Sequence, residues 1–570
     1  GYVSPDFRGH ACSFFIEPLL AQHDTSKVDV YAYAEFTQED AVTQRCKKSV
    51  AHWVPTYGMS DAVLAQRIRA DGIDILVDLA GHTAGNRLGV FALKPAPVSL
   101  TWMGYGYTTG LRAVDYFLTD ATYTPAGCEH LFSEALWRLP GSFVAYRPGS
   151  NMGEVGPLPA LERGHVTLGT LTRSVRINHH TVRVWAEILQ RLPTAHLVMD
   201  GRSFQDPTVR HAMMAKFIAY GIEPERVNIV FTSPPWDTLR SLDIALDCFP
   251  HNSGTTLFES LYMGLPFVTL AGRPSVGRLG SSLLHSVGHP EWIAHTEAEY
   301  VDKVLALASD LPALAQLRAN LRVQMQASPL MDESGFTRTV EQAYAGMFDR
   351  WQLGQPELAA AAKVRPTVRP PTRTREPSMD DMKLLTSFFE SQDYVAGTLA
   401  ARAMVKQYPQ HGFGWKALGA MLQAQGLAEE ALAAKRQAAK LLPRDAEAFC
   451  NLGHSLQNAE QYEQAESALK QALVLKASYP EAFNNLGITY QKMGQLDASE
   501  AQFRSALALQ PRHISIFDNL LFTLNYHPDH SAEVIFDSYQ EYERRFGAPL
   551  RSEWLPHTND RTPGRRLKVG

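Results

Sequence analysis

The C-terminal third of the chain repeats itself every 34 residues, and this interval limits the possible folds more than any other feature. Leu-Gly pairs keep this spacing at 418–419, 452–453 and 486–487. Aromatic residues follow the same step at Trp415, Phe449, Phe483 and Phe517. A unit of this length holds two antiparallel helices. Each unit buries its apolar face against its neighbours, so the units stack into a superhelix with a long concave surface.

An interval of 34 residues is that of the tetratricopeptide repeat, which we predict over residues 379–525. Its concave surface suits an extended polypeptide. Asparagines recur there just before a leucine, at Asn451, Asn485 and Asn519, whereas the first repeat has Ala417. An amide can donate and accept hydrogen bonds together, so a ladder of asparagines can hold a peptide backbone. The alternative is that asparagine is merely tolerated at an exposed position of the helix.

The totals exclude several classes of protein. A length of 570 residues predicts three or more domains. The net charge of −5 gives no indication of a nucleic-acid partner. Five scattered cysteines without a CxxC pair favour a reducing compartment and argue against a disulfide framework or zinc site. We find no apolar run of about 20 residues and no secretory signal, and therefore expect a cytoplasmic protein without a membrane span.

The first 355 residues alternate short apolar runs with amphipathic stretches. The runs expected to be strands are Val28–Ala34, Ile73–Leu79, Val98–Trp102, Tyr116–Thr119, Val166–Leu171, Leu197–Asp200, Val227–Phe231, Ile244–Leu246 and Phe267–Leu270. Near-continuous apolar strands separated by helices predict parallel sheets covered on both faces. Two such groups, 1–160 and 161–355, predict two Rossmann-like lobes. The fold class is therefore α/β plus all-α, and ligands are expected beyond the carboxyl ends of the strands.

Residues 356–378 are rich in Ala, Pro, Arg and Thr, which predicts an extended linker. Residues 526–564 are expected to form a connecting helix and loop. Residues 565–570 end as though a strand had been cut, and Gly1 opens as though entering one midway. Together they would complete the first strand of a Rossmann domain. We therefore hypothesise that the chain is a circular permutation of a protein with the repeats first and the α/β lobes second.

Several stretches give the chain a family resemblance. They are Gly1 to Phe7 with His10, Asp71 to Leu79, Phe91 to Pro97, and Asn252 to Thr256. With these in the family's order apart from the moved ends, the chain resembles the O-GlcNAc transferase family of the bacterial type. The resemblance covers most of residues 1–351 and the repeats. It implies a two-Rossmann GT-B glycosyltransferase that moves a sugar from a UDP donor to Ser or Thr of proteins.

The donor site is expected where residues 247–256 lead into a helix. A helix start preceded by Gly and hydroxyl residues offers free N–H donors and a positive dipole end, which suits a diphosphate. The resemblance implies that the phosphates bind at this start and that an acidic residue one turn later takes the ribose hydroxyls. The alternative is an ordinary helix cap. The expected donor-binding residues are Gly104, Arg173, His251, Ser253, Gly254, Thr255, Thr256 and Glu259.

Two residues are the candidates for catalysis. Arg176 lies where the family usually carries a lysine, and a fixed cation there would neutralise charge on the departing UDP. Arginine can do this but cannot give up its proton. His10 occupies the position of the family's histidine near the acceptor hydroxyl, where an imidazole can serve as base or orienting group. His82 is a second candidate for that role, although its loop could equally only shape the cleft.

The identity of the donor sugar stays open. His251 stands where relatives specific for N-acetylglucosamine have a smaller residue, and residues 104–110 lack the usual proline, so a plain hexose is an alternative. Residues 232–237 are shorter than the family's uracil-contacting loop. Trp236 could stack on the uracil or belong to the core.

The expected reaction is inverting transfer to Ser or Thr of a protein held by the repeats. The UDP-sugar is a substrate, and neither a cofactor nor a metal is expected. Two rivals remain: transfer to asparagine, and a scaffold that binds nucleotide without turnover.

Overall fold

The computed structural model describes residues 1–354 and 379–569, so the predicted linker 356–378 lies outside the described residues. By their contacts the described residues form two compact units. The α/β unit contains residues 1–204, 211–354 and 517–569, and the repeat unit contains 205–210 and 379–516.

The first lobe of the α/β unit is built on an eight-stranded sheet in which every pairing is parallel. Its strands are β1 (Tyr2–Ser4), β2 (Val28–Ala34), β3 (His52–Pro55), β4 (Ile75–Asp78), β5 (Val98–Thr101), β6 (Tyr116–Asp120), β7 (Ala135–Leu139) and β14 (Leu567–Val569). From one edge, β3 is followed by β2, then by β1 and β14 together, and then by β4, β5, β6 and β7.

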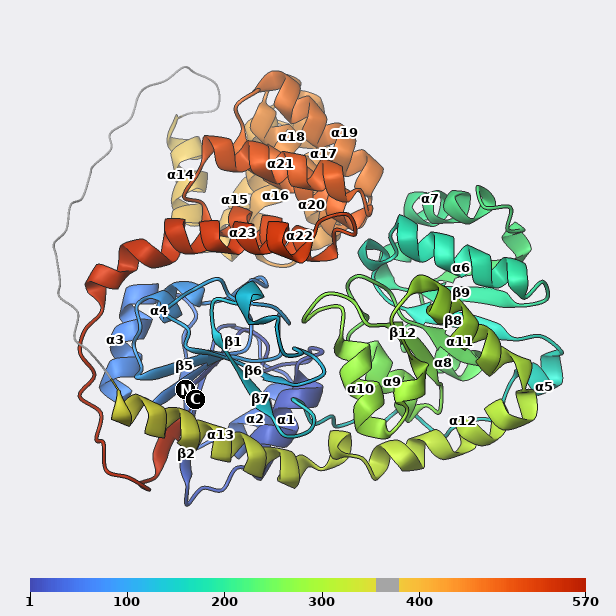
Figure 1. Cartoon of the computed structure of the whole chain (residues 1–570). Helices are drawn as coiled ribbons and strands as arrows, with labels where there is room; N and C mark the ends of the chain where they lie inside the picture. The colour runs from blue at the N-terminus through green and yellow to red at the C-terminus, as the bar shows by residue number, and fades with distance from the viewer. Residues whose placement is uncertain (355–378, 570) are drawn as a thin grey trace. The chain divides into compact units, whose positions relative to one another are not determined.

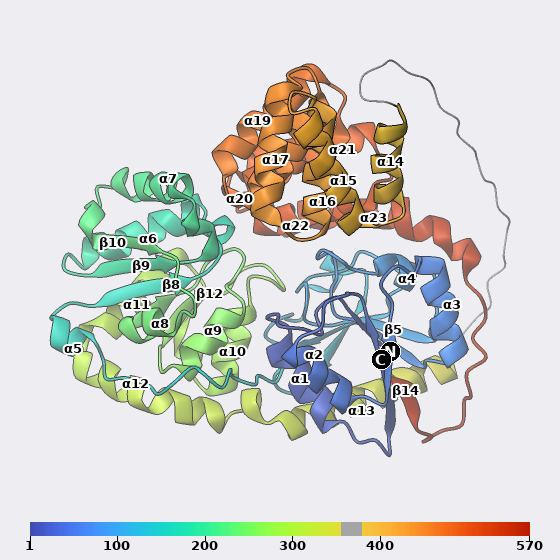
Figure 2. The ribbon, with the colours of Figure 1, turned by 180° about the vertical axis from the view of Figure 1, so that it is seen from behind.

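Strands β14 and β1 lie end to end and together fill one strand position of the sheet, between β2 and β4. Val569 pairs with Val30 of β2, and Tyr2 pairs with Ala32 two positions further along the same strand. On the other side, β14 and β1 both pair with β4. Figures 1 and 2 both show the two ends of the chain side by side. The middle of this sheet is thus supplied by both ends of the chain.

The second lobe is built on a six-stranded parallel sheet. Its strands are β8 (Thr167–Leu171), β9 (His196–Asp200), β10 (Val227–Val230), β11 (Ile244–Leu246), β12 (Phe267–Leu270) and β13 (Ile293–Ala294). Their order is β10-β9-β8-β11-β12-β13. This is the Rossmann order, which reverses between β8 and β11. A crevice for a ligand is therefore expected beyond the carboxyl ends of these two strands.

Helices pack around the two sheets of the α/β unit (Figure 1), and the last two of them contact loops of the first lobe. They are α1 (Ser13–Gln22), α2 (Ala41–Ser49), α3 (Asp61–Asp71), α4 (Leu88–Ala92), α5 (Ala160–Arg163), α6 (His179–Arg191), α7 (Pro207–Ile218), α8 (Trp236–Ser241), α9 (Thr255–Tyr262), α10 (Leu279–Val287), α11 (Glu297–Ser309), α12 (Leu311–Gln326), α13 (Glu333–Leu353), α22 (Ile514–Tyr526) and α23 (Ala532–Tyr542).

Helix α13 returns from the second lobe to the first. The sequence analysis assigns all of residues 161–355 to the second lobe. The helix contacts α1, β5 and β7. The phenol of Tyr344 lies 3.0 Å from that of Tyr2, and Phe336 packs against Trp102 with ring centroids 5.9 Å apart. The apolar side of α13 therefore covers the first sheet.

The nine predicted strands are confirmed to within about two residues, and so is the parallel arrangement. The sequence missed β3, β7 and β13. These three lie at edges of the sheets, and β3 and β7 are only partly buried. Edge strands need fewer apolar residues, so their pattern is weaker than that of a central parallel strand.

The repeat unit consists of paired antiparallel helices. They are α14 (Met379–Glu390), α15 (Tyr394–Gln407), α16 (Gly412–Ala424), α17 (Ala428–Leu441), α18 (Ala446–Asn458), α19 (Tyr462–Leu475), α20 (Pro480–Lys492) and α21 (Leu496–Leu509). The recurrent glycine has a packing role. A Cβ on Gly453 of α18 would lie 2.5 Å from the Leu469 side chain of α19, and one on Gly487 would lie 2.7 Å from Phe503. Only glycine lets the two helices of a repeat approach this closely.

Helix α22 begins at the spacing of the repeats but packs with the α/β unit. The sequence extended the repeats to residue 525, whereas the contacts of residues from Phe517 onward group them with the two lobes. Phe517 packs against Tyr542 and Phe546, at centroid distances of 5.7 Å each. Within the described residues, no helix combines the length and apolar character needed to cross a membrane.

Candidate active site

A pocket of about 460 Å³ lies beyond the carboxyl ends of β8 and β11, where loops of the first lobe face them. The wall contains Leu171 to Arg173 after β8 and residues 251–256 after β11. The first lobe contributes residues after β1 and β5. Eight of the ten predicted catalytic and donor-binding residues line this pocket: His10, Gly104, Arg173, Arg176, His251, Gly254, Thr255 and Thr256.

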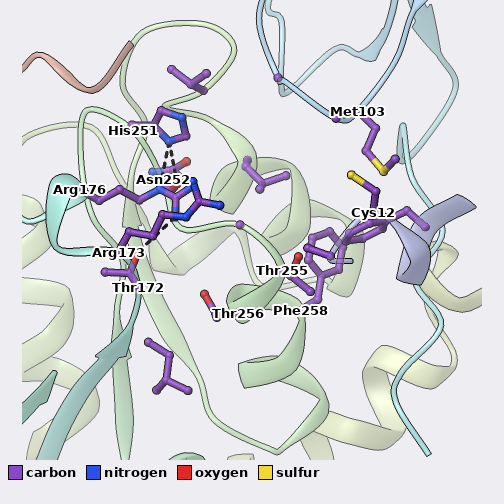
Figure 3. Close-up of a pocket in the computed structure, with 18 of the residues that line it drawn as sticks. Cys12, Met103, Thr172, Arg173, Arg176, His251, Asn252, Thr255, Thr256 and Phe258 are labelled. Atoms are coloured by element: carbon purple, nitrogen blue, oxygen red, sulfur yellow. Dashed lines mark hydrogen bonds between the residues drawn. The ribbon is translucent and has the colours of Figure 1, made fainter. Parts of the chain in front are cut away.

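The start of α9 forms one wall of the pocket (Figure 3). Gly254 is the N-cap residue, and no side chain caps the free N–H groups of the first turn. Thr255 and Thr256 open the helix and line the pocket. Uncapped N–H groups and the positive end of the helix dipole suit an anionic ligand such as a diphosphate.

A buried carboxylate shapes the loop that leads into α9. Asp247 accepts hydrogen bonds from the backbone N–H groups of Cys248 and Ser253, both at 2.8 Å, and from the Thr269 hydroxyl at 2.7 Å. Burial raises the pKa of Asp247 to about 7 despite these hydrogen bonds. The carboxylate thus folds the loop back on itself and fixes where the helix begins.

Arg176 and His251 form the polar end of the pocket (Figure 3). The Arg176 Nε donates towards Nδ1 of His251 at 3.4 Å, and Nη1 donates to the Thr172 hydroxyl at 3.4 Å. Burial, followed by the charge of Arg176, lowers the pKa of His251 well below its ordinary value. Burial also lowers the pKa of Arg176, but an arginine stays protonated at neutral pH. The pair therefore presents one positive charge and one neutral imidazole.

Tyr526, the last residue of α22, packs behind this pair. Its ring stacks on His251 with centroids 4.5 Å apart and planes inclined by 18°. The guanidinium carbon of Arg176 lies 5.7 Å from the centroid of the same ring. Tyr526 therefore contacts both His251 and Arg176. The sequence analysis did not predict a role for this residue.

Two sets of hydrogen bonds hold the end of α22 in place. The buried guanidinium of Arg273 donates to the carbonyl oxygens of Asn525, His527 and His530, the last two at 3.2 Å. The Asn525 amide donates to the phenol oxygens of Tyr105 and Tyr539, both at 2.9 Å. A cation at the carboxyl end of a helix stabilises its free carbonyl groups, so Tyr526 has a fixed support.

His10 lies at the rim, with 42% of its side chain exposed. Its Nδ1 is 3.5 Å from the Asp6 carboxylate and accepts the backbone N–H of Cys12 at 3.3 Å. Partial burial lowers the pKa of His10, Asp6 opposes this effect, and the nearby Arg173 adds to it. Since Nδ1 is engaged, Nε2 is the atom left for a substrate.

The opposite end of the pocket is apolar and includes Cys12, Met103 and Phe258 (Figure 3). Cys12 and Met103 come from the first lobe and Phe258 comes from α9. Gly104 follows Met103, and a Cβ there would lie 1.8 Å from the Leu79 carbonyl oxygen. Glycine is therefore required for this loop to lie so close to the strand β4 edge.

Two predicted donor-binding residues do not line the pocket. Ser253 is buried and its hydroxyl lies 3.3 Å from that of Thr172. Glu259 is buried on α9, and burial raises its pKa to about 7. Trp236 is the first residue of α8, and its neighbour Pro235, not Trp236 itself, lines the pocket.

His82, the second histidine candidate, is buried away from the pocket. Its Nδ1 lies 2.7 Å from the Asp518 carboxylate of α22, and its Nε2 lies 2.9 Å from the Thr109 carbonyl oxygen. Asn86 donates to the other oxygen of Asp518 at 3.1 Å. These contacts give His82 a structural position between the first lobe and α22.

The three predicted asparagines are partly buried on their helices. Asn451 lies on α18 and Asn485 on α20, both in the repeat unit, whereas Asn519 lies on the part of α22 that belongs to the α/β unit. The Asn485 amide donates towards the Cys450 sulfur at 3.7 Å. The structure therefore leaves two members of the predicted ladder in the repeat unit.

Two Rossmann-like lobes whose switch-point loops share a pocket with an uncapped helix start define a glycosyltransferase fold of the GT-B class. Comparison with known proteins makes this specific. The model of glycosyl transferase family 41 matches residues 1–147 and 164–340, more than half of the chain, and the chain therefore belongs to that family. Tetratricopeptide models match residues 458–494 and 481–512.

Similar proteins agree with this assignment and confirm the resemblance to the O-GlcNAc transferase family. The chain is 40% identical over 359 residues to SPINDLY of Solanum lycopersicum, a probable UDP-N-acetylglucosamine–peptide N-acetylglucosaminyltransferase; the match covers 62% of this chain and 39% of the relative. It is also 28% identical over 367 residues to SEC of Arabidopsis thaliana, which is described in the same words. That match covers 62% of this chain and 37% of the relative.

A solved structure of an O-GlcNAc transferase mutant from Thermobaculum terrenum is also similar. It is 36% identical with a TM-score of 0.59, over 62% of this chain and 68% of that one. The matches to the curated relatives SPINDLY and SEC cover only about two fifths of the length of those proteins.

Proposed function

We propose that the chain transfers a sugar from a UDP donor to the hydroxyl of Ser or Thr in protein substrates held by the repeats. The observation that carries this proposal is the pocket at the β8/β11 switch point. It combines the uncapped start of α9 with the cations Arg173 and Arg176. These features suit a nucleoside diphosphate, and the relatives' names supply UDP as the nucleotide and peptides as acceptors.

In the proposed reaction the acceptor oxygen attacks the anomeric carbon on the face opposite UDP. A new carbon–oxygen bond forms while the bond to the diphosphate breaks, and its electron pair leaves with UDP. The N–H groups at Thr255 and Thr256, together with the charge of Arg176, stabilise the diphosphate as negative charge builds on it. These groups are already in place, so little reorganisation accompanies the reaction.

In this proposal His10 orients the acceptor: because Nδ1 accepts the Cys12 N–H, Nε2 carries the hydrogen and donates it to the acceptor oxygen, while the proton of the acceptor hydroxyl passes to water. The lowered pKa of His10 keeps the imidazole neutral at pH 7, so Nδ1 stays an acceptor for the Cys12 N–H and Nε2 keeps its hydrogen. The chemistry uses no metal, because Arg176 and the helix start carry the charge stabilisation.

A panel of donors tests the proposal. Purified protein is incubated with UDP-N-acetylglucosamine or UDP-glucose and a peptide library, and UDP release and peptide mass are followed. We expect release of UDP together with a mass increase on Ser- or Thr-containing peptides. Transfer from UDP-glucose alone would assign the hexose alternative and point to His251. Modification only of asparagine, or binding of UDP without release, would overturn the proposal.

The variant Arg176→Ala tests the assigned role of the cation. It should lower kcat by roughly 100-fold, the size of effect typical of a lost charge-stabilising group, and change the affinity for UDP much less. Arg338→Ala, at an exposed position of α13, is the matched control and should keep the wild-type rate. An unchanged kcat in Arg176→Ala would contradict the role.

A further inference from the structure

Two adjacent histidines and an aspartate gather at the rim of the α/β unit, outside the pocket. His179 and His180 are the first two residues of α6, and Asp529 lies in the turn between α22 and α23. Their ligand atoms all lie within 4.8 Å of one another. Each side chain is between 39% and 61% exposed, so water and ions can reach the cluster.

The contacts in this cluster are long for hydrogen bonds, although the one between His180 and Asp529 still forms a weak one. Both Nε2 atoms approach the same oxygen, Oδ1 of Asp529, at 3.3 Å for His179 and 3.4 Å for His180. Hydrogen bonds from nitrogen to oxygen cluster at about 2.9–3.0 Å. Around a zinc ion with bonds of about 2.0–2.1 Å in tetrahedral geometry, neighbouring ligand atoms are about 3.3–3.4 Å apart.

A further carboxylate supports one of the histidines. Nδ1 of His180 lies 3.5 Å from the Glu297 carboxylate at the start of α11, and Glu297 is itself paired with Arg183. A histidine that binds a metal through one nitrogen usually directs its other N–H to a carboxylate, which fixes the ring and raises its basicity. The arrangement of Asp529, His180 and Glu297 follows this order.

We propose that His179, His180 and Asp529 form a binding site for a divalent transition-metal ion, with Zn²⁺ as the first candidate. Two imidazole nitrogens and one carboxylate oxygen are a donor set that suits zinc, and exposure leaves the fourth position to water. Glu297 orients His180. The site is separate from the sugar-transfer chemistry, which needs no metal.

The position of the site gives the ion a structural task. Helix α6 starts three residues after Arg176, and the turn that carries Asp529 starts directly after Tyr526. A bound ion would fasten these two segments together. It would therefore stabilise the contact of Tyr526 with Arg176 and His251 without touching the substrates.

The test is zinc binding by the full chain without an affinity tag. After removal of metal with a chelator, the protein is titrated with Zn²⁺ in a calorimeter. We expect one equivalent to bind with a micromolar or tighter Kd. Asp529→Ala and His179→Asn should weaken binding by at least 10-fold, and Glu297→Gln by roughly 10- to 100-fold. His211→Asn, at an exposed histidine of α7, should bind as the wild type does.

Two controls keep the outcome clear. Without metal, the substitutions at exposed positions should leave the melting temperature unchanged, whereas added Zn²⁺ should raise it for the wild type and not for Asp529→Ala. Cobalt distinguishes this site from Asp6, His10 and Cys12, which also lie within 4.8 Å of one another. A thiolate-to-cobalt band in the near ultraviolet would assign the metal to Cys12 and overturn the proposal. Zinc binding that survives Asp529→Ala, or none below millimolar concentration, would also overturn it.

Discussion

Tyr526 supports the polar end of the pocket through its contacts with His251 and Arg176. It stacks on His251 and lies under the guanidinium of Arg176. A stacked aromatic pair contributes about 0.5–1.5 kcal/mol beyond its buried area. Because both partners face the diphosphate in the proposed reaction, loss of the ring should disturb the geometry of transfer rather than the fold.

We therefore predict that Tyr526→Leu lowers kcat/KM for the UDP-sugar by roughly 3- to 10-fold, the rate equivalent of such a stacking energy. Tyr526→Phe keeps the ring and should stay within about twofold of the wild type. Steady-state kinetics of UDP release give both values. Equal losses in the two variants would mean that the hydroxyl, and not the ring, matters.

Glu259 contributes a dependence of stability on pH. Burial raises its pKa to about 7 in the folded chain, whereas an unfolded glutamate titrates near ~4.3. Between these two values the folded state holds a proton that the unfolded state has lost. The free energy of unfolding should therefore fall as the pH rises from about 4 to 7 and level off above 7.

Glu259→Gln removes this titration, so the variant should gain stability relative to the wild type as the pH rises through that window. The gain is on the order of 3 kcal/mol. Unfolding of the α/β unit at pH 5 and pH 8 without ligand measures it. Asp247 also has a pKa of about 7, but it is present in both proteins and cancels. A difference that does not change with pH would contradict the assignment.

At the scale of the elements, the repeat glycines determine how closely the two helices of a repeat approach each other, and α22 packs with the α/β unit. The recurrent glycine of each repeat lies against a large side chain of the partner helix, such as Leu469 for Gly453. An added methyl group there has no room. A nearby helical glycine, Gly414, leaves 3.2 Å between its added Cβ and the side chains of Met404 and Val405.

Gly453→Ala should consequently lower the stability of the repeat unit by about 1–3 kcal/mol, the usual cost of overpacking, even though alanine favours a helix. Gly414→Ala should be within about 1 kcal/mol of the wild type, because its neighbours can move and alanine gains helix propensity. Thermal unfolding followed by circular dichroism measures both. Equal stability of the two variants would rule out close helix approach as the reason for the glycine.

Helix α22 is fastened to the first lobe by the buried pair of His82 and Asp518. We predict that Asp518→Ala lowers the stability of the α/β unit by about 3 kcal/mol, because the buried His82 loses its carboxylate partner and the partly buried Asn86 keeps only the Thr83 carbonyl as acceptor. Glu541→Ala breaks partly exposed pairs with Arg544 and Arg545 and should cost less than about 1 kcal/mol. Chemical denaturation compares the two; similar losses would argue against a special role for the buried pair.

The periodic sequence predicted α22 as a helix but not its partners. Phe517 and Asn519 continue the 34-residue step, so residues up to 525 were assigned to the repeats. In the structure Phe517 packs on Tyr542 and Phe546 of the α/β unit. Periodicity reports that a helix has an apolar face; it carries no information on which neighbour covers that face.

For the whole molecule, the strand segments and their parallel arrangement followed from the sequence because buried parallel strands are nearly continuous apolar runs, whereas the order of the strands within each sheet did not. The approximate place of the pocket followed from the same pattern, since ligands lie beyond the carboxyl ends of such strands. The contributions of Tyr526 and Arg273 could not be predicted from the sequence. They depend on a contact between residues more than 250 positions apart, for which a single sequence holds no local signal.

The division into two units predicts the outcome of two deletions. Removal of residues 379–509 takes away α14–α21 and leaves α22, so the α/β unit should fold and bind UDP. Removal of 379–526 also takes Asp518, Asn525 and Tyr526, and UDP binding should be lost or the unit should unfold. Limited proteolysis and calorimetric titration with UDP compare the two proteins. If both deletions bound UDP equally well, α22 would not belong to the α/β unit.

The strand position that β14 and β1 share in the first sheet has a consequence for biosynthesis. The segment 567–569 follows every other described strand along the chain and is synthesised after them, yet its place is between β2 and β4. Until it arrives, the nascent first lobe holds an open slot lined by unpaired backbone groups, which is a hazard for aggregation. The second sheet is built from strands within residues 167–294 and carries no such gap, so protection against aggregation is needed chiefly for the first lobe.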